Sequence, residues 1–193
     1  MFEQIHARLE RLAQFAVWVG GAALLAAAVM VTIDVFLRKL FSITMSGSDE
    51  ISGYVFAAGT TWAYSYCLLH RANIRIDAVY NLLPRRLCGA LDILGVMLLL
   101  IFNAVLARHS WKVFATSFER DSVSITTLAT PLWIPQLFWV TGLIVFELVL
   151  VFVALYAVVR YFQRDDAAVN RVVGVPTVAE EVEEETRGVV EGA

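Results

Sequence analysis

The sequence predicts an all-α membrane protein with four transmembrane helices and short amphipathic interfacial helices, and three observations support this. Of its 193 residues, 59% are hydrophobic and 17% are charged, whereas about a quarter of the residues of a soluble domain are charged. Four apolar windows are long enough to cross a hydrocarbon core of about 30 Å. Each window is continuous, which favours helices over the alternating segments of roughly ten residues found in membrane barrels.

The predicted spans divide the chain into three parts. An amphipathic arm over residues 1–12 is followed by a membrane domain over 13–162 and an acidic, disordered cytoplasmic tail over 163–193. The tail contains the run "EEVEEE" and too few apolar residues to offset the entropy of ordering it. The four spans cover about residues 13–37, 51–69, 87–107 and 132–159.

Two segments have the three- and four-residue apolar spacing of helices that lie at a membrane interface. The arm places Phe2, Ile5, Leu9 and Leu12 on one face, and a simple extension of the first span explains this pattern equally well. The second segment, between the third and fourth spans, repeats the pattern. Its apolar residues are Trp111, Phe114, Ala115 and Phe118.

The distribution of Lys and Arg predicts the orientation, because positive residues are retained on the cytoplasmic side. With the N-terminus inside, and counting up to Arg171, nine of these residues lie in inner segments and five in outer loops. Both termini are therefore expected in the cytoplasm. Asp49 and Glu50 then lie at the outer surface.

Ionisable residues inside predicted spans are costly, so each suggests a function or a partner. Asp34 stands four residues before Arg38, and the two can pair on one helix face. A structural ion pair is the favoured interpretation. Glu147 lies midway along the fourth span, where a relay and a polar contact between helices are equally good interpretations.

The second span begins with two acids and has two packing stripes. Asp49 and Glu50 fall in its first turn, where carboxylates complement free N–H groups and the helix dipole, within reach of Arg38 and Lys39. An anchoring role is favoured over a proton or substrate site. Small residues form one stripe, which suits close helix packing, and larger residues form the other. One stripe is expected to contact the rest of the chain, and the other a partner or lipid. The stripes are Gly53, Ala57 and Thr61, and Tyr54, Ala58, Trp62 and Tyr66.

The residues after the second span are basic and suit anionic lipid or an acidic loop. They include Arg71, Arg75, Arg85 and Arg86.

Enzyme chemistry has little support in the sequence. No H-x-x-x-H, C-x-x-C or G-x-S-x-G pattern occurs, and the three His residues are not within the spans. We therefore expect no catalytic residues, no metal, no cofactor and no nucleic-acid partner.

The order of several motifs resembles the small permease subunit of tripartite ATP-independent periplasmic (TRAP) transporters over about residues 10–160. The motifs are the acidic pair, "GTTWAYSYCLLHRANIRID" (Gly59 to Asp77), "LLPRRL" and "TPLWIPQ". The most specific part combines the acidic pair, the apolar helix with a central Trp, and the exit of that helix with Arg71, Arg75, Ile76 and Asp77. The family often has an aromatic residue just before the acid, where this chain has Gly47 and Ser48.

The resemblance implies a secondary transport system for organic acids that is driven by a sodium gradient. A periplasmic binding protein captures the acid and delivers it to a large permease subunit. The small subunit is expected to be a non-catalytic scaffold in contact with membrane lipids and the large subunit, and a possible docking surface for the binding protein. Alternatives are a dimeric, proton-coupled small transporter that uses Glu147 and, less favoured, a membrane enzyme or redox protein.

Overall fold

The computed structural model describes residues 2–72 and 84–174, which fold into five helices. No strand of a sheet is found in these two ranges; one isolated bridge joins Val123 and Pro131. The all-α class is therefore confirmed for the part of the chain described. The helices are α1 (Phe2–Phe41), α2 (Ser48–Leu69), α4 (Arg85–Glu119), α5 (Trp133–Phe162) and α6 (Asp166–Val173).

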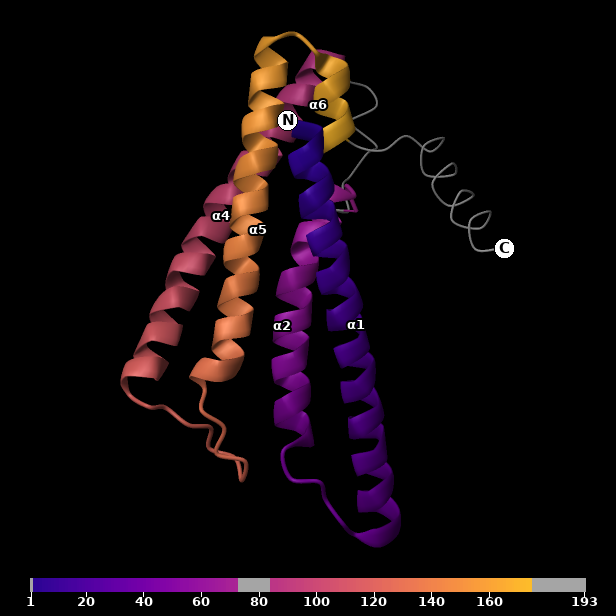
Figure 1. Cartoon of the computed structure of the whole chain (residues 1–193), viewed down its shortest axis with the longest axis vertical. Helices are drawn as coiled ribbons and strands as arrows, with labels where there is room; N and C mark the ends of the chain where they lie inside the picture. Colours follow the sequence, from indigo (N-terminus) through magenta and orange to yellow (C-terminus); the bar gives the residue numbers. More distant parts are fainter. Residues whose placement is uncertain (1, 73–83, 175–193) are drawn as a thin grey trace, which may run out of the picture.

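The long helices form two antiparallel hairpins, α1–α2 and α4–α5, which pack together through α2 and α5 (Figure 1). The order of contact is therefore α1, α2, α5, α4, with α1 and α4 on the outside. The N-terminus and α6 lie at one end of the molecule, which we call the α6 end. The connections 42–47 and 120–132 lie at the other, which we call the loop end.

Three of the four predicted spans correspond to helices that are long and apolar enough to cross a membrane, namely α1, α4 and α5. The predicted second span is present as the 22-residue helix α2. Its hydroxyl residues, among them Thr60, Thr61 and Ser65, keep it from having an 18-residue stretch as apolar as those of the other three. That α2 crosses the membrane stays a prediction.

The predicted interfacial helices are not separate elements in the described ranges. The N-terminal arm continues into α1 without a break, and Trp111 to Phe118 lie within α4. The physical reason is that no Gly or Pro stands near either expected boundary to end the helix. Of the two interpretations of the arm, the structure therefore has the extension of the first helix.

The beginning of the predicted disordered tail is instead the short helix α6. The chain turns at Arg164, which has a φ of 58°, and the Asp165 carboxylate caps the helix by accepting from the Ala168 N–H at 3.1 Å. Val169 and Val173 lie one turn apart and are buried. The acidic run "EEVEEE" lies outside the described residues.

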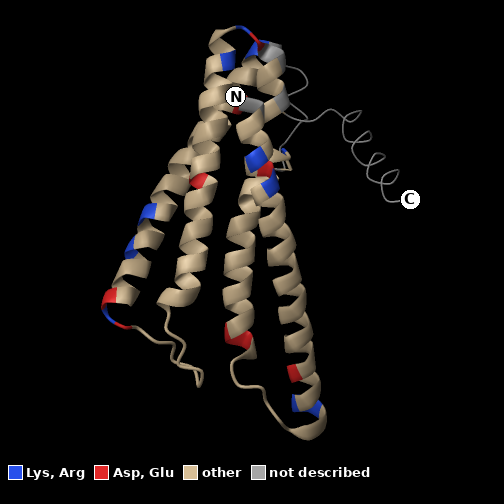
Figure 2. Cartoon of the chain, in the orientation of Figure 1, with Lys and Arg blue, Asp and Glu red and all other residues tan. Residues whose placement is uncertain are grey.

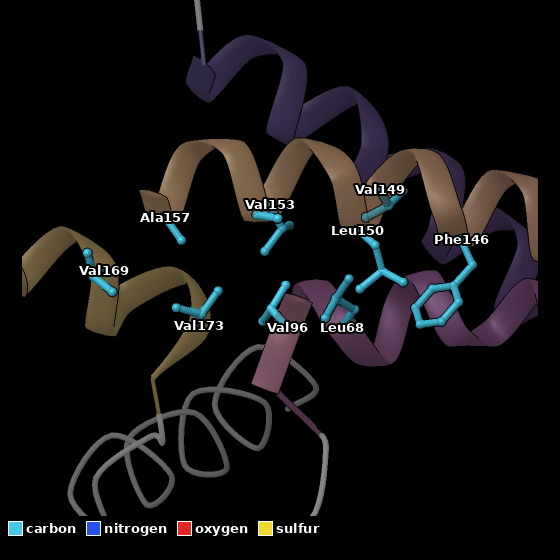
Figure 3. Packing of buried hydrophobic residues seen from close by; sticks show 10 residues of the cluster. Leu68, Val96, Phe146, Val149, Leu150, Val153, Ala157, Val169 and Val173 are labelled. Carbon is cyan, nitrogen blue, oxygen red and sulfur yellow. The ribbon is translucent and has the colours of Figure 1, made fainter. Parts of the chain in front are cut away.

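Most of the buried apolar residues form one cluster near the α6 end (Figure 3). The cluster joins four helices: Leu68 comes from α2, Val96 from α4, Leu150 from α5 and Val173 from α6. In the most apolar 18-residue window, 44% of α5 is buried, against 6% of α1. Helix α5 is thus the centre of the fold, and α1 is its most exposed long helix.

Candidate functional site

Asp34 joins three parts of the chain at the loop end. Its side chain is 1% exposed. It pairs with Arg38 on α1, accepts a hydrogen bond from the Met45 N–H at 2.5 Å, and accepts one from Ser48 Oγ at 3.2 Å. The pair predicted from the four-residue spacing is therefore present. The links to Met45 and Ser48 mean that Asp34 also fixes where α2 begins relative to α1.

Glu50 joins α2 to the connection between α4 and α5. Its carboxylate accepts from Thr126 Oγ1, and from the Tyr54 hydroxyl at 2.7 Å. The hydrogen bond from Thr126, followed by that from Tyr54, lowers the pKa of Glu50 to about 2. Its neighbour Asp49 is exposed. The partners of Glu50 are thus hydroxyl groups rather than the expected Arg38 and Lys39.

The two connections at the loop end touch each other. Ser46 Oγ and Thr127 Oγ1 form a hydrogen bond. Gly47 has a φ of 96°, which favours glycine, and a β-carbon there would clash with the Leu128 side chain. We call these contacts and those of Asp34 and Glu50 the loop-end network. It joins the two helical hairpins at the loop end.

The two predicted stripes on α2 do not divide as expected into an inner and an outer face. Thr61 is buried against Gly142, where an added β-carbon would lie 2.5 Å from Thr61 Oγ1. Trp62 Nε1 donates to the Phe138 carbonyl at 2.9 Å. Both side chains therefore contact α5. Gly53 faces open space, and Ala57 is partly buried.

Two glycines outside the predicted stripes face each other where α1 and α2 pack. A β-carbon on Gly20 would lie 3.2 Å from the Gly59 Cα. Small residues allow this proximity between helices. The sequence signal that could have predicted this helix contact is a glycine within each of the two apolar segments.

At the α6 end, the basic residue Arg71 contacts the C-terminal segment. Its guanidinium donates to the Asn170 carbonyl of α6 at 3.4 Å. Beside it, His70 Nε2 lies 3.5 Å from a carboxylate oxygen of Glu10 on α1. Arg75 and Asp77, named for the exit of the second span, lie outside the described residues.

Glu147 binds a neighbouring helix. Its carboxylate accepts a hydrogen bond from Asn103 Nδ2 of α4 at 2.7 Å, and the same amide donates to the Leu143 carbonyl at 3.2 Å. Figure 2 shows most charged residues toward the helix ends, with one acidic position in the middle of α5; Glu147 is the acidic residue of that helix. This geometry is the polar contact between helices that the sequence left as one of two interpretations.

The residues described thus lie in the loop-end network, at the α1–α2 and α2–α5 contacts, in the middle of the α4–α5 contact and at the α6 end. The hydrogen bonds described there join helices and connections of the chain to one another. In the described ranges, no group of three or more His, Cys, Asp or Glu residues could hold a metal ion. The class defined by the fold is a helical membrane protein whose polar side chains fasten its own helices together.

A family model narrows this class. The model described as "Tripartite ATP-independent periplasmic transporters, DctQ component" matches residues 27–164. The chain belongs to this family, which is the small permease component of TRAP transporters. This confirms the resemblance seen in the motifs. The family is one of transporter components and not of enzymes.

No curated protein and no solved structure shows significant similarity to the chain.

Proposed function

We propose that this chain is the non-catalytic small membrane subunit of a sodium-gradient-driven TRAP transporter that takes up organic acids with the help of a periplasmic binding protein. Its task is to scaffold the large permease subunit. Membership of the family supports the assignment to a tripartite system.

The main structural support for a scaffold is the apolar surface of the two outer helices. On α1, Trp18 is 73% exposed and Leu25 is 71% exposed; on α4, Phe102 is 65% exposed. Such surfaces are stable in contact with lipid or with another membrane protein. A long, flat arrangement of helices that is apolar on its outside suits a subunit that lies against a larger one.

The arrangement of the ends supports the proposed orientation in the bacterial inner membrane. Because α1 and α2 are antiparallel, as are α4 and α5, the N-terminus and α6 lie on one side of the membrane if all four helices cross it. The excess of Lys and Arg on that side favours the cytoplasm. The loop-end network would then face the periplasm.

A periplasmic position of the loop end would also favour a contact with the binding protein. Two backbone hydrogen bonds close the connection between α4 and α5, from the Ser124 N–H to Thr130 and from the Leu132 N–H to Ser122, each at 2.9 Å. At its tip Ile125 is fully exposed. A loop that is closed by backbone hydrogen bonds and has an exposed apolar tip suits contact with a soluble partner.

Co-purification and transport measurements test the proposal. The chain should co-purify with a much larger polytopic protein, and sodium-dependent uptake of an organic acid should be lost when the chain is deleted and return when it is supplied again. A stable lone protein whose deletion leaves uptake unchanged would contradict the proposal.

Two glycine variants separate assembly from folding of the chain itself. Gly53 faces open space, so Gly53→Leu should leave the isolated chain folded and reduce the yield of the complex if this face meets the large subunit. Gly142→Leu is the matched variant, because it would clash with Thr61 and disturb the α2–α5 contact of the isolated chain. Unchanged complex yield in Gly53→Leu would show that this face of α2 meets lipid.

No observation favours the alternative of a self-sufficient dimeric transporter.

A further inference from the structure

Glu147 places a carboxylate near the centre of the most apolar helix of the chain. It stands 14 residues after the first residue of α5 and 15 before the last. At about 1.5 Å per residue, both ends of the helix are roughly 20 Å away. An ionisable group at such a depth in a membrane is costly unless it has partners.

Asn103 satisfies part of this carboxylate. The Asn103 side chain is 2% exposed, and it donates to Glu147 Oε2 and to the Leu143 carbonyl. Both hydrogen bonds hold α4 against α5. A carboxylate has two oxygens and accepts up to about four hydrogen bonds. One oxygen is bound by Asn103, and the other is available to a further donor.

The free side of Glu147 opens onto an apolar surface. The Glu147 side chain itself is partly exposed. On the adjoining outward side of α5, Ile144 is 37% exposed, Leu148 is 64% exposed and Val151 is 38% exposed. If this stripe faced lipid, the carboxylate would meet hydrocarbon. The stripe is therefore better suited to another protein helix.

The charge of Glu147 defines what that helix should present. Within residues 2–72 and 84–174, no Lys, Arg or His forms a salt bridge with Glu147. A charged carboxylate in a water-poor environment is best stabilised by a cation that also donates hydrogen bonds. Asn103 is neutral, so a basic side chain on the partner helix would complement a charged Glu147.

We propose that Glu147 binds a Lys or Arg side chain on a transmembrane helix of the large permease subunit, and that this helix packs along Ile144, Leu148 and Val151. The inference rests on the proposed function, because it requires the large subunit as a partner. It adds a specific contact to that function. Asn103 acts as a positioning residue that points the carboxylate toward the partner.

The first test measures how fast the small subunit dissociates from an affinity-tagged large subunit in detergent. Glu147→Gln can still accept from Asn103 but has no charge, so it should speed dissociation at least tenfold while leaving the thermal midpoint of the isolated chain nearly unchanged. Glu119→Gln, which removes an exposed acid at the end of α4, is the control and should dissociate like the wild type. Equal dissociation of wild type and Glu147→Gln would overturn the inference.

A second test does not depend on how well the Glu147 variant folds. A photoreactive amino acid in place of Leu148 should cross-link to the large subunit in the assembled transporter. Cross-linking to a second copy of the chain, or to lipid alone, would overturn the inference. If the wild-type chain co-purifies with the large subunit but both tests fail, the proposed function stands and the Glu147 contact is wrong. If the wild-type chain does not co-purify with the large subunit, the proposed function itself fails.

Discussion

At the loop end, hydrogen bonds to Asp34 and Glu50 join the helices and their connections, whereas at the α6 end packed apolar side chains join them. The loop-end network includes the charged carboxylate of Glu50 and several hydroxyl groups. The cluster at the α6 end contains Val169 and Val173 of α6 together with Leu68 of α2 and Val153 of α5 (Figure 3).

The difference follows from what each end has available for packing. Connections 42–47 and 120–132 have no buried apolar side chain, so hydrogen bonds hold them: backbone bonds within 120–132, and side-chain bonds between the connections and the helices. Helix α6 has two buried valines one turn apart and can dock through apolar contact. The loop end should therefore respond to changes of charge and pH, and the α6 end to changes of side-chain shape.

The largest expected effect is that of Asp34→Ala. The substitution leaves the Arg38 guanidinium, the Met45 N–H and the Ser48 hydroxyl without their buried acceptor. The thermal midpoint in detergent should therefore fall further than in Val169→Asp or Gly47→Ala. Asp49→Ala, which removes an exposed acid in the first turn of α2, should change it little; equal shifts in the two Asp variants would contradict the role of Asp34.

The next largest effect is expected from Val169→Asp at the α6 end. Placing a carboxylate at a side chain that is 1% exposed should weaken docking of α6 on the order of 3 kcal/mol. Proteolysis between α5 and α6 should then accelerate at least tenfold. Asn170→Asp, which adds a similar charge at the exposed neighbouring position, is the control. Rapid cleavage of both variants would show that charge alone, and not burial, controls α6.

A smaller loss is expected from Gly47→Ala. Its left-handed backbone and its contact with Leu128 both oppose a β-carbon, so the free energy of unfolding should fall by about 2 kcal/mol. Gly53→Ala is matched to it, because Gly53 is helical and faces open space. That variant should be neutral or more stable by up to about 1 kcal/mol. Chemical denaturation of both variants checks this difference, and a neutral Gly47→Ala would contradict the proposed packing of the two connections.

The smallest effect is the pH dependence contributed by Glu50. Its pKa is lowered to about 2 in the folded chain, so its contribution is fully present above its ordinary pKa of about 4.5 and is lost as the pH falls toward 2. Thermal midpoints measured across this range should fall more in the wild type than in Glu50→Gln. Asp49→Asn should keep the wild-type profile. A wild-type profile in Glu50→Gln would remove Glu50 from the loop-end network.

The partners of the polar side chains could be predicted when they lie on the same helix. Asp34 and Arg38 are four residues apart, so the helical repeat alone brings them together. Glu50 and Thr126 are 76 residues apart, and Asn103 and Glu147 are 44 apart. No local pattern connects such residues, because their proximity depends on how the two hairpins pack.

The departure of this chain from the family's pattern at Gly47 and Ser48 also has a structural basis. Gly47 occupies a left-handed conformation beside Leu128, and Ser48 is buried and donates to Asp34. A large aromatic side chain would not fit at either position in this arrangement.

The sequence by itself determined the all-α class, the location of the apolar helices and the family, because length, hydropathy and motif order are properties of the chain read in one dimension. The tertiary structure decided that the arm continues into α1, that α6 docks on the cluster, and that Trp62 contacts α5. It also decided that Glu147 meets Asn103 while one side of its carboxylate stays open. These outcomes depend on which helix faces meet, and that is fixed by packing between segments distant in the sequence.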